Sequence, residues 1–126
     1  MNLLLDTCGL LALSNGTLTT AAVRALRTAP EACVSAVSAW EVAIKVSSGK
    51  LTLRQSPARW FEAVLDRHRI REIPLDHAQA CDAAALPPIH RDPFDRVLIA
   101  LALSRSLSLI TNDRFILQYP NLDTLW

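Results

Sequence analysis

The sequence predicts an α/β protein, with a central parallel sheet of four to five short strands flanked by helices on both faces. Short apolar runs without polar alternation recur along the chain, and such runs are typical of strands covered on both faces. Segments with helical start and stop signals separate these runs, so strands and helices alternate from one end to the other. The 126 residues, 51% of them apolar, suit one domain over residues 1–126.

The first part of the chain is expected to hold two strands and three helices. In order, these are a strand over Asn2–Leu5, helices over Thr7–Leu13 and Thr19–Thr28, a strand over Ala32–Ser35 and a helix over Ser38–Ser48. Three consecutive leucines end the first strand, which is why we expect it to be buried on both faces. Gly16 and Gly49 close the first and third helices, and Pro30 stops the second.

The second part continues the alternation. Its expected elements are a helix over Pro57–Arg69, a strand over Ile70–Ile73, helices over Asp76–Ala85 and Pro93–Ser104, a strand over Leu107–Thr111, a short helix over Arg114–Gln118 and an edge strand over Leu122–Leu125. Ser56 and Pro57 have the residue types favoured at a helix cap and first turn. Asp92 and Pro93 give the same signal before the long apolar helix.

Composition and charge exclude several classes of protein. There are 13 Lys and Arg against 12 Asp and Glu, so binding of nucleic acid would depend on a local patch and not on net charge. No apolar run of about 18 residues exists to cross a membrane. Asp6 interrupts the apolar stretch at the N-terminus, so a signal peptide is not expected. Three widely spaced cysteines, Cys8, Cys33 and Cys81, predict buried free thiols in a cytoplasmic protein.

Two carboxylates come directly after predicted strands. Asp6 follows the first strand, and Asp113 follows the strand Leu107–Thr111 in the sequence ITND. The carboxyl ends of parallel strands meet at one edge of the sheet, which is where ligands bind in such folds. Both residues also precede a possible helix, so helix capping is the alternative interpretation for each.

Two further acids lie on predicted helices. Asp95, in DPFDR, falls in a first turn, where it favours the helix dipole, but Ile99 and Ala102 on the same face predict that it points inward. Glu41 shares a narrow polar stripe with Lys45. A solvated ion pair is the simpler interpretation of that stripe, and a carboxylate facing a cleft is the other.

A divalent cation is predicted by the acids taken together, namely Asp6, Glu41, Asp95 and Asp113. Clustered carboxylates repel one another unless a cation compensates them, and oxygen ligands select Mg²⁺ or Mn²⁺ over zinc. Such ions activate water for attack on a phosphodiester. His68, His77 and His90 lack zinc spacing and are expected to be surface or packing residues. Only three glycines are present, which excludes a phosphate-binding glycine loop.

Four blocks of sequence in this order resemble the PIN-domain ribonucleases, and most closely the VapC-type toxins of bacterial toxin–antitoxin pairs. The blocks are LLLDT, SAWEVAIKVSSGKL, HRDPFDRVLIALAL and LITND, and the resemblance runs from Leu3 to about Phe115. It implies an endoribonuclease dependent on Mg²⁺ or Mn²⁺ that cleaves single-stranded or structured RNA, with transfer RNA among the candidates. It also implies a cognate antitoxin protein, a homodimer and no membrane.

The resemblance also implies roles for individual residues. Asp6 and Asp95 match the direct metal ligands of the family, and Glu41 and Asp113 match the supporting acids of the catalytic set. The small polar residues near the site are matched by Thr7 and Asn112, and Asp92 is interpreted as the helix cap.

Two other classes remain open at the level of sequence. A haloacid-dehalogenase-type phosphohydrolase also begins with an Asp after its first strand, but it needs a second Asp where this chain has Cys8. A non-catalytic binding module, either a receiver-like domain or an inactive PIN-like domain, is the other alternative. The acidic pair of a receiver is not evident, and acids at all the matched positions argue against an inactive PIN-like domain.

Overall fold

Five parallel strands form one sheet in the order β3-β2-β1-β4-β5 in the computed structural model, which describes residues 1–126. The strands are β1 (Leu3–Leu5), β2 (Ala32–Ser35), β3 (Arg71–Ile73), β4 (Ser108–Ile110) and β5 (Thr124–Leu125). In the central strand, Leu4 is in register with Cys33 of β2 and with Leu109 of β4. The predicted fold class is confirmed, and the last strand is an edge strand as expected.

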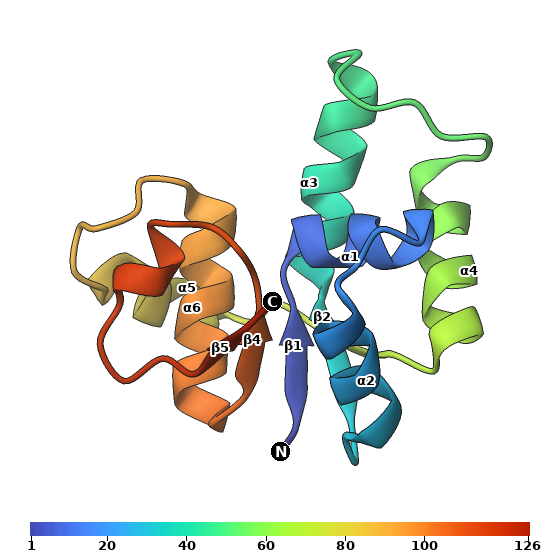
Figure 1. Cartoon of the computed structure of the whole chain (residues 1–126). Coiled ribbons are helices and arrows are strands. Elements are labelled where there is room, and N and C mark those ends of the chain that lie inside the picture. Colours follow the sequence, from blue (N-terminus) through green and yellow to red (C-terminus); the bar gives the residue numbers. More distant parts are fainter.

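Six α-helices and one short 3₁₀ helix cover the sheet. They are α1 (Thr7–Asn15), α2 (Thr20–Thr28), α3 (Ala36–Ser47), α4 (Pro57–His68), α5 (His77–Ala85), α6 (Pro93–Arg105) and η1 (Ile116–Gln118). Figure 1 shows α5 and α6 on one side of the sheet and α1, α2 and α4 on the other. In the same view α3 continues from β2 beyond the carboxyl edge of the strands. The predicted cover on both faces is therefore confirmed.

The alternation of side chains along β1 divides the interior into two cores. Leu3 and Leu5 belong to one core, together with Phe61 of α4, and Leu4 belongs to the other, together with Leu101 of α6. All three leucines are fully buried. The strand is apolar throughout because its two faces pack against different sets of helices.

The start of α3 differs from the prediction. The helix begins at Ala36, two residues before the predicted Ser38. Ser35 is the last residue of β2 and also the N-cap of the helix, because its hydroxyl oxygen accepts a hydrogen bond from the N–H of Val37 at 3.1 Å. The strand therefore leads into the helix without a loop, and Glu41 is held rigidly above the sheet.

Strands β1, β3 and β4 begin one residue later than predicted and β5 begins two residues later, and β3 and β4 do so for the same reason. The N–H of Ile70 is donated to the carbonyl of Leu65, and the N–H of Leu107 to that of Ala102, at 3.0 and 2.9 Å. These bonds close α4 and α6, so neither N–H belongs to the sheet. The predicted short helix near residue 116 is a 3₁₀ turn.

The three cysteines are free, as predicted, but only Cys33 is buried. The prediction of buried thiols is wrong for Cys8 and Cys81, which are exposed. Helix α5 packs through Gln79 and Ala83, which lie on another face of the helix from Cys81. None of the helices is both long and apolar enough to span a membrane.

The connections place the carboxyl ends of β1 and β4 at a distinct point of the sheet. The chain leaves β1 through α1 and α2 on one face, and it reaches β4 through α5 and α6 on the other face. Adjacent strands whose connections diverge in this way leave a crevice beyond their carboxyl ends, where ligands bind in α/β folds.

Candidate active site

Asp6 lies at this crevice and is almost completely buried, with 3% of its surface exposed. Its Oδ1 accepts a hydrogen bond from the N–H of Gly9 at 2.6 Å, so it caps α1 as the alternative interpretation expected. A Cβ on Gly9 would lie 3.0 Å from this Oδ1 and 3.2 Å from the carbonyl oxygen of Ile110. The glycine therefore lets the carboxylate sit against the backbones of both α1 and β4.

Burial is the main cause of a raised pKa at Asp6. Hydrogen bonds from Thr111 and Gly9 oppose the shift, and the negative charges of Asp113 and Glu41 add to it. A residue that served only as a cap would be stabilised by bonding without neighbouring charges of the same sign. Asp6 is thus a cap that also belongs to a group of acids.

Asp95 lies in the first turn of α6, behind the cap formed by Asp92, whose Oδ1 accepts the N–H of Phe94 at 2.9 Å. Its side chain is 15% exposed. Ile99 and Ala102, one and two turns further along, are buried, so the predicted inward direction of this face is correct. Burial is the largest cause that raises the pKa of Asp95 to about 8.

The remaining causes of that pKa shift are the negative charges of neighbouring acids, namely Asp92, Glu41, Asp6 and Asp113. The four acids that were predicted to converge therefore lie close enough to act on one another. Glu41 and Asp95 lie on α3 and α6, and Asp6 and Asp113 lie in the segments that follow β1 and β4. The structure places the set at the carboxyl edge of the sheet. Of the four acids, Asp95 and Asp113 belong with His90 to the group whose ligand atoms all lie within 4.8 Å of one another, and Asp6 and Glu41 do not.

Asp113 is held by the backbone that follows it. Its Oδ1 accepts hydrogen bonds from the N–H groups of Phe115 and Ile116, at 2.8 and 3.1 Å. Its own N–H donates to the hydroxyl of Thr111 at 3.1 Å. The carboxylate is thereby fixed at the start of the turn that leads into η1.

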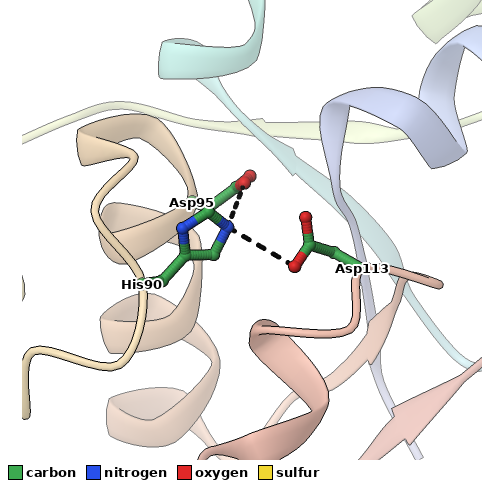
Figure 2. A group of neighbouring side chains, drawn as sticks. All are labelled: His90, Asp95 and Asp113. Carbon is green, nitrogen blue, oxygen red and sulfur yellow. Dashed lines mark ion pairs between the residues drawn. The ribbon is translucent and has the colours of Figure 1, made fainter.

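His90 is part of the same cluster, and the expectation that it is a surface or packing residue is wrong. Its Nε2 lies 2.9 Å from Oδ2 of Asp95 and 3.4 Å from Oδ1 of Asp113 (Figure 2). Its Nδ1 accepts the N–H of Asp92 at 3.2 Å, so the ring proton is on Nε2. Neither carboxylate is aligned as a hydrogen-bond partner of this buried nitrogen. The Nε2 atom of His90 therefore lies between the carboxylates of Asp95 and Asp113, and the three side chains together surround a position that could hold a cation.

Glu41 satisfies both interpretations made from the sequence. Its Oε2 pairs with the ammonium of Lys45 at 3.4 Å, yet the Glu41 side chain is only 12% exposed. Its Oε1 is buried and has no hydrogen-bond partner. One oxygen of the Glu41 carboxylate thus pairs with Lys45, and the other is free to bind a ligand.

The two small polar residues of the predicted site differ in their surroundings. Thr7 is buried, and its hydroxyl donates a hydrogen bond to the hydroxyl of Ser38 at 3.0 Å, which ties α1 to α3. Asn112 is exposed in the segment between Thr111 and Asp113.

Arg96 holds the loop that carries His90, a role the sequence did not indicate. Its guanidinium lies 3.5 Å from the Tyr119 hydroxyl and donates to four carbonyl oxygens, those of Ala84, Leu86, Pro87 and His90, at 2.8–3.3 Å. Tyr119 adds to this network, because its hydroxyl accepts the N–H of His90 at 2.9 Å and donates to Pro87 at 3.1 Å. The final Arg of DPFDR therefore positions the His of HRDPFDR.

Replacement of Arg96 by methionine is expected to lower the free energy of unfolding by about 2–3 kcal/mol, since hydrogen bonds from a charged donor to four exposed or half-buried carbonyls are lost. Urea unfolding followed by circular dichroism measures this. Arg24→Met is the matched control, because Arg24 is exposed on α2. Equal losses in the two variants would show that the Arg96 network contributes nothing to stability.

The donor set fits a divalent cation. Ligand atoms of His90, Asp95 and Asp113 all lie within 4.8 Å of one another, and the orphaned Oε1 of Glu41 is one further oxygen. Binding through Nε2 would require His90 to move its proton to Nδ1 and lose the bond from Asp92. The carboxylates are therefore the better ligands, and hard divalent ions prefer oxygen.

Comparison with known proteins agrees with this architecture. Ribonuclease VapC22 of Mycobacterium tuberculosis is 29% identical over 112 residues, which cover 86% of this chain and 85% of that protein. A toxin–antitoxin complex from Klebsiella pneumoniae contains a chain with a TM-score of 0.65 and 22% identity, covering 95% of this chain and 94% of that one. A chain of VapBC2 from Rickettsia felis, bound to a promoter DNA fragment, has a TM-score of 0.70 and 15% identity, with 99% and 98% covered.

The family model of the PIN domain matches residues 3–121, nearly the whole chain. The haloacid-dehalogenase and receiver interpretations are thereby excluded. By this match, and with the sheet order and cluster of acids described above, the chain belongs to the PIN domain family.

Proposed function

We propose that this protein is a metal-dependent endoribonuclease and the toxin of a toxin–antitoxin pair. The observation that carries the proposal is the cluster of Asp6, Glu41, Asp95 and Asp113 at the carboxyl edge of the sheet. Burial first, and then the charges of Asp92 and of the other acids, raise the pKa of Asp95 in this cluster to about 8. A divalent cation bound among these carboxylates would relieve their mutual repulsion, so the cluster is suited to hold one. Similarity to a protein named as a ribonuclease supports RNA as the substrate.

In this proposal Asp6 and Asp95 hold the ion, Mg²⁺ or Mn²⁺, with Glu41 and Asp113 in support. When bound, the ion supplies an activated water and neutralises the charge that develops on the phosphodiester. Gly9 fixes the Asp6 carboxylate, and the buried position of Asp95 limits solvent access.

The partners proposed are a cognate antitoxin protein and a second copy of the chain. Support for the antitoxin comes from the similar solved structures, several of which are toxin–antitoxin complexes. An antitoxin that covers the crevice would block RNA and silence the activity. Homodimerisation is proposed from the family likeness, and transfer RNA is one candidate among single-stranded and structured substrates.

The purified protein is expected to cleave a labelled RNA only when Mg²⁺ or Mn²⁺ is present, and gel electrophoresis of the products tests this. Unstructured RNA and a transfer RNA pool form the two substrate arms. Asp66→Asn, at an exposed acid of α4, is the matched control and should cleave like the wild type. Cleavage that persists in excess chelator would contradict the metal assignment, and a protein that cleaves no RNA would be a non-catalytic PIN domain.

Induction of the wild-type chain in a bacterial host is expected to stop growth, and the Asp95→Asn variant is expected to relieve the arrest. Equal toxicity of the two would point to a cause other than catalysis, such as aggregation.

A further inference from the structure

Two clefts flank the loop that carries His90, and they share Arg91 and Asp92. One, of about 460 Å³, lies between α3 and the start of α6, and its lining includes Glu41, Lys45 and Phe94. The other, of about 540 Å³, has His90 and Phe115 in its lining. Glu41 of the acid cluster therefore lines the first cleft, and His90, which lies beside Asp95 and Asp113, lines the second.

One exposed aromatic ring, that of Trp40, lies beside the first cleft through its contact with Phe94, and another, that of Phe115, lines the second cleft. Trp40 is 59% exposed and meets the ring of Phe94 edge to face, with 5.1 Å between centroids. Phe115 is 39% exposed, and the guanidinium of Arg114 lies 5.0 Å from its centroid. Large apolar rings left open beside polar sites are typical of surfaces that bind a ligand. A base stacks readily on such a ring, because every base has a π face.

Positive charges accompany these rings, although the chain has a net charge of only +1. Lys45, Lys50 and Arg91 line the first cleft, against the acids Glu41, which pairs with Lys45, and Asp92. Arg91 and Asp92 also line the second cleft. Side chains of this kind bind the phosphates of a single strand, while the acid cluster between them takes the cation.

We infer that single-stranded RNA crosses the acid cluster along the two clefts, with one base stacked on Trp40 beside Phe94 and another stacked on Phe115. Arg91, at the junction of the clefts, binds a phosphate of the intervening backbone. This inference rests on the proposed function and adds to it the path of the strand. In this inference the rings of Trp40 and Phe115 bind bases of any sequence, and the acids of the cluster bind only the cation.

The experiment measures binding without cleavage. The Asp95→Asn protein is titrated into a short fluorescein-labelled single-stranded RNA, and fluorescence anisotropy gives the dissociation constant. Trp40→Ala and Phe115→Ala, each added to this background, should weaken binding about tenfold, as loss of one stacked base does. Trp40→Phe should retain most of the affinity. Leu75→Ala is the matched control, because Leu75 is 40% exposed and lines neither cleft.

Tryptophan fluorescence gives an independent readout on the same proteins. The chain has three tryptophans, and Trp60 is only 8% exposed, so Trp40 is the one most open to a stacking base. RNA should quench the emission of the Asp95→Asn protein, and Trp40→Phe should remove most of that quench. Arg91→Gln should reduce the slope of log affinity against log salt by about one, as expected when one phosphate contact is lost.

The outcomes separate this inference from the proposed function. If Trp40→Ala and Phe115→Ala bind RNA like the parent while the wild type cleaves it, the stacking path is wrong and the nuclease assignment stands. If Trp40→Ala abolishes self-association in size-exclusion chromatography and leaves RNA affinity unchanged, the surface belongs to a second copy, and the inference is overturned. If the parent neither binds nor cleaves RNA, the proposed function fails first and the inference fails with it.

Discussion

Replacement of Asp95 by asparagine is expected to reduce RNA cleavage by more than about 1,000-fold and to raise the melting temperature of the metal-free protein. The loss of cleavage follows because a ligand that fixes the ion contributes several kcal/mol to stabilisation of the transition state. The gain in stability follows because the folded protein buries the Asp95 carboxyl and surrounds it with other acids. Desolvation first and charge repulsion second raise its pKa to about 8. Asparagine removes that repulsion, and its amide oxygen still lies beside Nε2 of His90.

Relief of the repulsion is expected to stabilise the metal-free fold by about 1–3 kcal/mol, the usual size of strain stored at functional sites. Four thermal melts near pH 7.5 measure it: wild type and Asp95→Asn, each in chelator and in Mn²⁺. The wild type should gain about 2.7 kcal/mol when the ion is at 100 times its dissociation constant, and the variant should gain much less. Asp66→Asn should respond like the wild type.

A purely structural Asp95 would give the opposite result. The carboxylate lies in the first turn of α6, where it interacts favourably with the helix dipole, and loss of that interaction costs about 0.3–1 kcal/mol. The variant would then melt below the wild type with and without metal, and Mn²⁺ would shift neither protein. That pattern would remove Asp95 from the active site.

The positions of Asp6 and Asp113 were predictable because parallel strands impose a simple geometry. Residues that follow neighbouring strands reach the same edge of the sheet, whatever the intervening helices do. Both were also open to interpretation as caps, and the structure gives both the bonds of a cap. One carboxylate can cap a helix and also belong to an active site, so the two interpretations of Asp6 and Asp113 do not exclude each other.

His90 could not be placed in the same way, because it lies in an irregular loop between α5 and α6. No periodicity relates it to Asp95, and its position depends on Arg96 and Tyr119, which close the loop through carbonyl groups. The signal available in the sequence was the HRDPFDR block itself, in which the His and the final Arg belong to one hydrogen-bonded unit.

The exposure of Trp40 could not be predicted from the sequence, for a reason that differs from that for His90. The helical wheel separates an apolar side of α3 from its polar stripe, but it does not tell where the sheet beneath the helix ends. Val37 and Val42 are buried, whereas Trp40 and Ile44 are open. Because α3 continues past the carboxyl edge of the strands (Figure 1), part of its apolar surface has no sheet to cover it.

The affinity of the protein for Mg²⁺ or Mn²⁺ is expected to rise with pH and to level off near pH 8. A carboxyl group must be deprotonated to bind the ion, and the pKa of Asp95 is raised to about 8, chiefly by burial. The pKa of Asp6 is raised as well, for the same main reason. Below pH 8 each proton displaced by the ion should lower the apparent affinity about tenfold per pH unit.

Stability of the metal-free protein should change in the opposite direction over the same range. The pKa of Asp95 is above the ordinary 3.8 in the folded state, so the folded protein binds more protons than the unfolded chain between about pH 4 and pH 8. Stability therefore falls as pH rises through this window and becomes constant above it. The slope has an upper limit of about 1.4 kcal/mol per pH unit for one such group.

Isothermal titration of Mn²⁺ at pH 6, 7 and 8 measures the first effect, and two buffers of different ionisation enthalpy give the number of protons released. Urea unfolding in chelator over the same pH values measures the second. Asp95→Asn should flatten both profiles, whereas Asp66→Asn should leave both unchanged. A wild-type affinity that is independent of pH, with no proton released, would mean that Asp95 is already ionised in the metal-free protein. The repulsion among the four acids would then be too weak to make the cluster depend on a cation.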